Sequence, residues 1–439
     1  MTSGFASVPD TPRYRIANAR VATCLTEARL PPDHDGLALA DLFIADGELV
    51  DITPPQGEAG TEGLDLDGGI VLPRLVDCHV HLDKGHIWPR RRNPDGTFPG
   101  ALENVMADRE AHWSAADVRA RMEFGLRSAF AYGTAAMRTH LDSLGKQIGI
   151  TWPVYAELRA EWAGRVALQA SPLFGIQFAL DPEHMKAVIE AVTAHGDKLI
   201  GCVTYMIPDL DRALDIMVTA AKEHGFDLDF HVDETGDPQA RSLEHIADAV
   251  LRHGFSGKVL CGHCCSLALQ NRQDEARIIA KVKEAGIAVV SLPMCNMYLQ
   301  DRQAGRTPRW RGVAPVHELA AAGVSVMIAS DNTRDPFYAY GDLDLIEVLR
   351  EGTRTLQLDH AGTQWPRMLG PTPAAMMGMP GAGMIAVGAP ADLILTRARD
   401  WTEFFARPQS DRSVLVGGQV IDRTLPDYRD LDHLEGMPW

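Results

Sequence analysis

Strand-like and helix-like patterns alternate between residues 70 and 330, and this alternation constrains the fold more than any other feature of the chain. Apolar runs that end in polar residues are typical of buried parallel strands, which are covered on both faces. The segments between them carry helical patterns that end at or near glycine, the residue expected just past a helix C-terminus. The predicted strands are 70–82, 134–142, 165–173, 199–205, 226–234, 258–265, 287–296 and 324–332. The helical patterns include 117–133, 182–196, 210–225 and 274–286.

Eight strands that alternate with helices predict an α/β fold, a (β/α)8 TIM barrel, with a doubly wound open sheet as the alternative. The two ends of the chain differ, because 14–55 and 387–423 contain short strand-like runs joined by turns. We expect them to form one small β-sandwich-like domain. The predicted boundaries are 1–70 for its N-terminal part, 71–380 for the barrel and 381–439 for its C-terminal part. The segment 87–100 is a predicted long loop at the end of the barrel where active sites form, and we expect it to act as a lid or substrate wall.

Composition and charge limit the expected partners. The 439 residues are 46% hydrophobic and 23% charged, which is ordinary for a soluble globular enzyme. A formal net charge of −17 disfavours binding to nucleic acid or to an anionic membrane. We see no transmembrane segment and no signal peptide, so we expect a cytoplasmic location.

The seven cysteines are scattered along the chain, as expected for reduced thiols that behave as small buried hydrophobes. Cys261 and Cys264 have CxxC spacing, which leaves a redox site or a structural zinc site as an alternative. A structural zinc would need a second ligand pair, and the sequence has no second CxxC.

Polar residues of the kind that hold catalytic metals follow four of the predicted strands. Residues two apart on a strand share a face, so the two histidines of the first strand point the same way. In a barrel, the C-terminal ends of the strands converge on one mouth. Taken singly, each histidine could be a core or surface residue and the aspartate a helix cap. The candidate residues are His79, His81, His231, Glu234, His263 and Asp331.

Three imidazoles and one carboxylate suit zinc or ferrous iron better than calcium or magnesium. A second metal would want a bridging ligand after the fourth strand, which ends in Val-Thr-Tyr. We therefore expect one divalent metal ion, Zn or Fe(II), with Glu234 and His263 free for proton transfer beside the water that the metal activates.

Longer motifs carry a resemblance to a known family: HVHLDK (79–84), MRTHLD (137–142), HVDE (231–234), NMYLQDR (296–302) and SDNTRDPFYAYG (330–341). With these motifs the chain resembles the amidohydrolase superfamily and, within it, the prokaryotic cytosine deaminase family. The resemblance implies that the metal ligands are His79, His81, His231 and Asp331. It also implies that Glu234 and His263 shuttle protons and that Asp331 takes the proton of the attacking water. The substrate contacts that it implies are Asp83, Leu173, Gln300 and Asn332.

Two of these positions depart from the family pattern. Leu173 stands where cytosine deaminases carry Gln, and Asn332 stands where they usually carry a second Asp. Both changes would make the pocket less charged and more apolar. We therefore expect a metal-dependent hydrolytic deaminase of an aminated nitrogen heterocycle, cytosine or a 5-substituted cytosine such as 5-methylcytosine, which gives the oxo product and ammonia.

Two alternatives stay open: removal of an amine or alkylamine from a triazine-type ring, and a non-catalytic barrel that serves as a scaffold. The expected partners are a small heterocyclic substrate and other copies of the chain in a homo-oligomer. Nucleic acid and membrane are not expected as partners.

Overall fold

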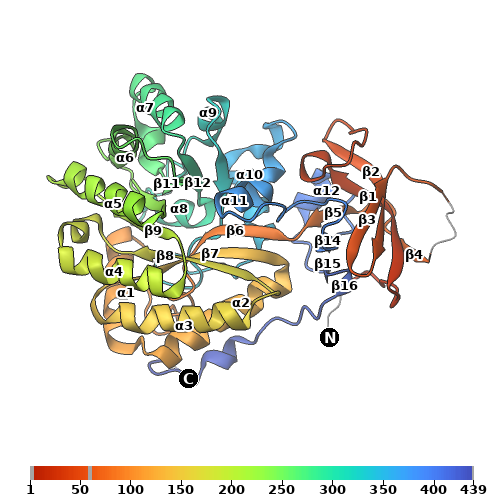
Figure 1. The fold of residues 1–439 in the computed structure, drawn as a ribbon, viewed down its shortest axis with the longest axis horizontal. Helices are drawn as coiled ribbons and strands as arrows, with labels where there is room; N and C mark the ends of the chain where they lie inside the picture. Colours follow the sequence, from red (N-terminus) through yellow and green to blue (C-terminus); the bar gives the residue numbers. More distant parts are fainter. Residues whose placement is uncertain (1–3, 58–61, 438–439) are drawn as a thin grey trace. The chain divides into compact units, whose positions relative to one another are not determined.

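The computed structural model describes residues 4–57 and 62–437 of the chain (Figure 1). It divides the chain into two compact units, the first made of residues 1–77, 127–136 and 343–426, and the second of residues 78–126, 137–342 and 427–439. The two units differ from the predicted domains. The small domain was predicted to include the C-terminal segment to residue 439, whereas the segment after residue 426 belongs to the unit that carries most of the central strands.

The first unit is built around an eight-stranded sheet to which both ends of the chain contribute. The strand order is β16-β15-β14-β5-β1-β2-β3, and β4 pairs with β1. Ile16, Leu42 and Leu393 belong to its buried apolar core. Its strands are β1 (Arg13–Ala22), β2 (Leu37–Ala45), β3 (Glu48–Thr53), β4 (Gly63–Asp65), β5 (Ile70–Pro73), β14 (Leu393–Leu395), β15 (Ser413–Val416) and β16 (Gln419–Val420). Its helices are α10 (Leu345–Leu356), α11 (Pro371–Met376) and α12 (Trp401–Ala406).

The first predicted strand, 70–82, is two strands in the structure, and the single-strand prediction is wrong here. β5 pairs within the eight-stranded sheet, whereas β6 (Leu75–Val80) belongs to a separate three-stranded sheet. Proline has no N–H for a sheet ladder, so the end of β5 at Pro73 is a natural breaking point. The buried guanidinium of Arg74 fills the break, where it contacts Asp392 at 3.2 Å and donates to the carbonyl of Thr134.

The second unit contains the other strands. Strands β9 to β13 form a five-stranded parallel sheet in sequential order, and β6, β7 and β8 form a three-stranded sheet. Isolated parallel bridges join Val80 to Asp331 and Gly175 to Val203. The predicted mixed α/β class with parallel strands is confirmed. The strands after β6 are β7 (Thr134–Asp142), β8 (Ala167–Leu173), β9 (Leu199–Thr204), β10 (Asp227–Val232), β11 (Val259–His263), β12 (Ala288–Ser291) and β13 (Val326–Ile328).

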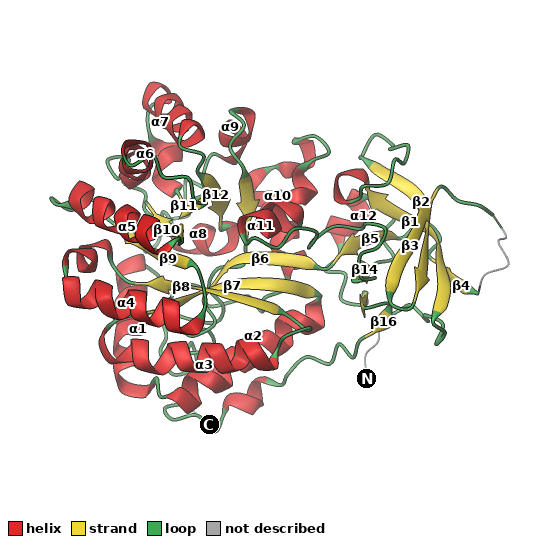
Figure 2. Cartoon of the chain, in the orientation of Figure 1, coloured by secondary structure: helices red, strands yellow, loops and turns green. Residues whose placement is uncertain are grey.

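Helices lie beside these strands (Figure 2). α3, α4, α5 and α9 contact strands directly. The predicted loop 87–100 ends earlier than expected, because α1 begins at Phe98, and Thr97 caps it through the amide of Gly100. No helix in the described part of the chain is long and apolar enough to span a bilayer. The helices are α1 (Phe98–His112), α2 (Ala115–Tyr132), α3 (Ile148–Glu161), α4 (Pro182–His195), α5 (Leu210–His224), α6 (Ser242–Arg252), α7 (Arg272–Glu284), α8 (Pro293–Leu299) and α9 (Val316–Ala321).

Candidate active site

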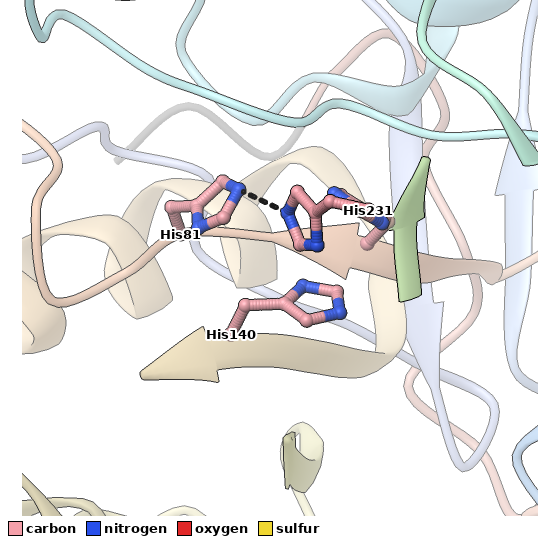
Figure 3. A group of neighbouring side chains, drawn as sticks. His81, His140 and His231 are labelled. Atoms are coloured by element: carbon pink, nitrogen blue, oxygen red, sulfur yellow. Dashed lines mark hydrogen bonds between the residues drawn. The ribbon is translucent and has the colours of Figure 1, made fainter. Parts of the chain in front are cut away.

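Four of the predicted residues meet at the ends of strands β6, β10 and β13. His79 lies on β6 and His81 directly follows it, His231 lies on β10, and Asp331 follows β13. The Nε2 atoms of His81 and His231 are 3.2 Å apart and face one another (Figure 3). Oδ1 of Asp331 lies 3.2 Å from Nε2 of His81 and 3.6 Å from Nε2 of His79. All four side chains are buried.

The donor set of this cluster fits a divalent metal ion. Neither ring nitrogen of His79 has a hydrogen-bond partner among the described residues. Burial, followed by the charges of neighbouring imidazoles, holds the pKa of His79 and of His231 well below its ordinary value. Neutral imidazole is the form that binds metal. Three nitrogens and one carboxylate oxygen are the ligands that zinc or iron accepts.

A fourth imidazole, His140 on β7, belongs to the same cluster and is absent from the sequence-based set of candidates. Its ring centroid is 4.1 Å from that of His79, and Figure 3 shows its ring beside those of His81 and His231. Its Nε2 lies 3.1 Å from Oδ1 of Asp229, whose Oδ2 accepts a hydrogen bond from Arg138 at 2.8 Å. When Nε2 donates to the carboxylate, Nδ1 presents its lone pair. The sequence contained a signal for His140. Arg138 and His140 are two residues apart in the motif MRTHLD, so on a strand they share one face.

Glu234, His263 and Asn296 form a hydrogen-bonded group beside the metal ligands. Nδ2 of Asn296 lies 3.1 Å from Oε1 of Glu234 and 2.9 Å from Nδ1 of His263. Since the amide nitrogen donates, Nδ1 of His263 accepts, and the proton of this neutral ring sits on Nε2. Burial and the charge of His140 lower the pKa of His263 to about 3, which keeps the ring neutral.

The pKa of Glu234 is shifted in the opposite direction from that of His263. Burial and the nearby carboxylate of Asp331 raise its pKa well above the ordinary value. The acid form of Glu234 is therefore favoured, and an acid form can donate a proton at neutral pH. Gln300, predicted to contact substrate, instead donates to the backbone carbonyl of Glu234 at 3.2 Å. Asn296 was not predicted as a site residue, although it opens the motif NMYLQDR.

A pocket with an empty volume of about 690 Å³ opens over this group, and His81, His231, Glu234 and His263 contribute to its lining. Its wall is largely apolar, and one face of α1 supplies much of it. The predicted wall segment 87–100 reaches the pocket only through Phe98, the first residue of that helix. The apolar lining residues are Phe98, Leu102, Val105, Met106, Leu144, Leu173, Phe174, Val203 and Phe337.

Charged side chains also line the pocket, beside the apolar ones. Asp142 contacts Lys84 at 3.1 Å and Arg109 at 2.8 Å, and all three line the pocket. Asp83, a predicted substrate contact, lies beneath them and accepts from the backbone amide of Asp142 at 2.7 Å. It is fully buried and is not among the lining residues of the pocket.

Leu173 and Asn332 both line the pocket. Although position 332 is Asn rather than Asp, a carboxylate is still present in this region. Nδ2 of Asn332 donates at 2.7 Å to the fully buried Asp335. Burial raises the pKa of Asp335 to about 6. The residue type at position 332 does not by itself reveal this neighbouring acid.

The cysteine alternative finds no support in the structure. All seven thiols are free and buried. Among the described residues, no potential metal-binding group includes Cys261 or Cys264. Burial raises the pKa of both thiols well above its ordinary value, which disfavours the reactive thiolate.

Residues 158–422 match the amidohydrolase family, a span that covers more than half of the chain. The chain belongs to this family. The predicted membership of the amidohydrolase superfamily is thereby confirmed, and this amidohydrolase is a hydrolase that acts on carbon–nitrogen bonds.

Individual relatives are similar over most of their length. A pterin deaminase from Rhizobium rhizogenes is 53% identical over 438 residues, which cover 99% of this chain and 100% of that protein. An N-isopropylammelide isopropyl amidohydrolase from a Pseudomonas species is 26% identical over 368 residues, 81% of this chain and 86% of that protein. The crystal structure of 5-methylcytosine deaminase from Klebsiella pneumoniae superposes with a TM-score of 0.79 at 22% identity, and the match covers 94% of this chain and 98% of that one.

Proposed function

We propose that this amidohydrolase is a metal-dependent hydrolytic deaminase whose substrate carries a pterin-type ring. The observation that carries the proposal is the 53% identity, over 99% of the chain, to a protein described as a pterin deaminase. The pocket supports a ring-shaped substrate, because its wall is largely aromatic and aliphatic. In this pocket Phe98 and Phe337 meet edge to face, with centroids 5.3 Å apart.

The proposed ligands of the metal are His79, His81, His231 and Asp331, and when bound the metal would act as a Lewis acid that lowers the pKa of water. Asp331 would take a proton from the water that attacks the ring carbon. Glu234, in its acid form, would protonate the adjacent ring nitrogen as the new carbon–oxygen bond forms. Asp331 would then pass its proton to the exocyclic amine, the carbon–nitrogen bond breaks and ammonia leaves. The new hydroxyl would return a proton to Glu234, and the oxo product keeps the proton on the ring nitrogen.

Asn296 and His263 would act as supports in this scheme. The proton on Nε2 of His263 is free to donate to the attacking water and so orient it. Asn296 would fix the Glu234 carboxyl and the His263 ring in position relative to each other, since its amide nitrogen is within hydrogen-bond distance of both. Such pre-positioned donors stabilise charge as it develops in the transition state.

We further propose that the strands of the second unit close into a (β/α)8 barrel. The bridges Val80–Asp331 and Gly175–Val203 support it, because each joins one end of the three-stranded sheet to one end of the five-stranded sheet. A closed barrel explains why side chains from β6, β7, β10 and β11 reach one point.

Cytosine, the ring expected from the sequence motifs, is not retained as the first candidate. The likeness to 5-methylcytosine deaminase is a likeness of fold at 22% identity, whereas the pterin deaminase is similar in sequence throughout. Charged residues in the wall, above all Lys84 and Arg109, also weaken the argument for a small apolar substituent.

The test is a comparison of amine release by the enzyme loaded with Zn²⁺ or Fe²⁺, measured as ammonia from pterin and the pyrimidines and as isopropylamine from N-isopropylammelide. Pterin, cytosine, 5-methylcytosine and N-isopropylammelide would be assayed under identical conditions. We expect kcat/KM for pterin to exceed that for either pyrimidine at least a hundredfold. A folded, metal-loaded enzyme that prefers a pyrimidine or the triazine, or that leaves pterin unchanged, would refute the pterin assignment.

A further inference from the structure

A second cavity lies in the same compact unit as the active site and shares no lining residue with the active-site pocket. Its empty volume, which includes space open to solvent, is about 810 Å³. It lies between the segments that follow β6 and β13 and the C-terminal segment. The lining residues are His86, Pro89, Arg334, Tyr428, Arg429, Leu431, Asp432 and Met437.

Arg334 supplies the cavity with a cation. Among the described residues, its guanidinium forms no ion pair with a carboxylate, and its buried Nε has no hydrogen-bond partner. The guanidinium lies over the ring of Tyr428, 4.2 Å from the centroid. A guanidinium that is stacked on a ring keeps its N–H edge available, and this edge matches the two oxygens of a carboxylate.

His86 supplies a second polar group that lacks a partner. Its side chain is 97% buried, yet neither ring nitrogen has a hydrogen-bond partner in the described part of the chain. Buried polar groups are nearly always hydrogen-bonded in native proteins, so a lone buried imidazole at a cavity wall indicates an absent partner. Burial and the nearby charges of Arg334 and Arg121 lower the pKa of His86 to about 3. The ring is therefore a neutral donor and acceptor at physiological pH.

The other lining residues limit the class of ligand that the cavity can bind. Pro89, Leu431 and Met437 make part of the wall apolar. The other arginine, Arg429, contacts Asp427 and is highly exposed, so it adds little free positive charge. The carboxylate of Asp432 also lines the cavity and would repel a dianion such as phosphate.

We propose that this cavity binds a small monocarboxylate with an apolar or aromatic body. The carboxylate lies against the edge of the Arg334 guanidinium, the His86 ring donates a further hydrogen bond, and the apolar body contacts Leu431 and Met437. The site is separate from the active-site pocket, and its occupant does not compete with the substrate.

Benzoate is the probe that tests the proposal, with titration calorimetry on the full-length, metal-loaded protein. We expect saturable binding of one benzoate per chain, and at least tenfold weaker binding of benzamide, its neutral isostere, and of inorganic phosphate. Arg334→Gln should weaken benzoate binding at least tenfold, since it removes the cation that has no carboxylate partner among the described residues of the wall. Arg429→Gln, the matched control in the same cavity, should change the affinity less than twofold.

Arg109→Gln distinguishes this cavity from the active-site pocket, because Arg109 lines only the latter. It should leave benzoate binding within twofold of the wild type. The proposal is overturned if wild-type protein does not bind benzoate, if Arg334→Gln binds it unchanged, or if Arg109→Gln abolishes binding. Binding of phosphate tighter than that of benzoate would overturn the assignment of a monocarboxylate.

Discussion

Replacing Asn296 by alanine tests the arrangement of the proposed acid and its supporting histidine. The substitution removes one hydrogen bond to Glu234, at 3.1 Å, and one to His263, at 2.9 Å, in a fully buried position. Net values of about 1–1.5 kcal/mol for each buried hydrogen bond give a combined loss of about 2–3 kcal/mol. If that loss falls on the transition state, kcat decreases roughly 30- to 150-fold, because about 1.4 kcal/mol corresponds to a factor of ten.

The assay is steady-state ammonia release at saturating substrate, together with the metal content of each preparation. Met297→Ala is the matched control, since Met297 is the next residue of α8 and is 46% exposed, whereas Asn296 is fully buried. We expect this control to keep kcat within twofold, and both variants to bind a full complement of metal. A metal-replete Asn296→Ala enzyme with kcat within threefold of the wild type would refute the supporting role of Asn296.

Five further predictions concern the residues around this group. Glu234→Gln should keep its metal but lose roughly two to four orders of magnitude in kcat. Because the raised pKa of Glu234 favours the acid form, wild-type kcat should fall as pH rises through that pKa; an identical fall in Glu234→Gln would contradict the assignment. His231→Ala should lose its metal, as measured by elemental analysis, while its circular dichroism stays that of the wild type; full metal occupancy would show that the site is misplaced. Asp229→Asn should weaken metal affinity roughly 10- to 100-fold in a chelator competition, because it loosens His140, which it contacts at 3.1 Å and whose ring packs 4.1 Å from that of the proposed ligand His79. Asn332→Asp should lower the melting temperature more at pH 8 than at pH 5, since it places two carboxylates within 2.7 Å where an amide now donates; equal shifts at both pH values would argue against that contact.

Much of the fold and the central residues of the site could be predicted from local patterns. Strand β7 coincides with the predicted range 134–142, and the histidines of β6 and β10 lie at strand ends as expected. These features depend on alternation and apolar runs, which are written in consecutive residues. The break at Arg74 was missed because the run 70–82 is apolar on both sides of it, although Pro73, which has no N–H for a sheet ladder, was a local signal of it.

Features that depend on distant residues were not predictable in the same way. Asp229 lies 89 positions from His140 in the chain, so nothing local signals that the carboxylate orients that imidazole. The pairing of Asn332 with Asp335 could have been considered, since they are only three residues apart, but the burial of the acid comes from tertiary packing. Which ring the enzyme accepts depends on the shape and charge of the pocket wall, to which α1 contributes. The first three residues of α1, 98–100, were predicted to belong to a loop.

The eight-stranded sheet also has a consequence for the order in which the protein can fold during synthesis. Strand β5 lies between β1, which leaves the ribosome before it, and β14, which is made only after all the strands of the second unit. Until residues 393–395 emerge, one edge of β5 has no partner strand, and an unpaired apolar edge is a template for pairing with another chain. Growing chains of this protein therefore carry an incomplete sheet through most of their translation, and slow elongation would favour association between nascent chains at that edge.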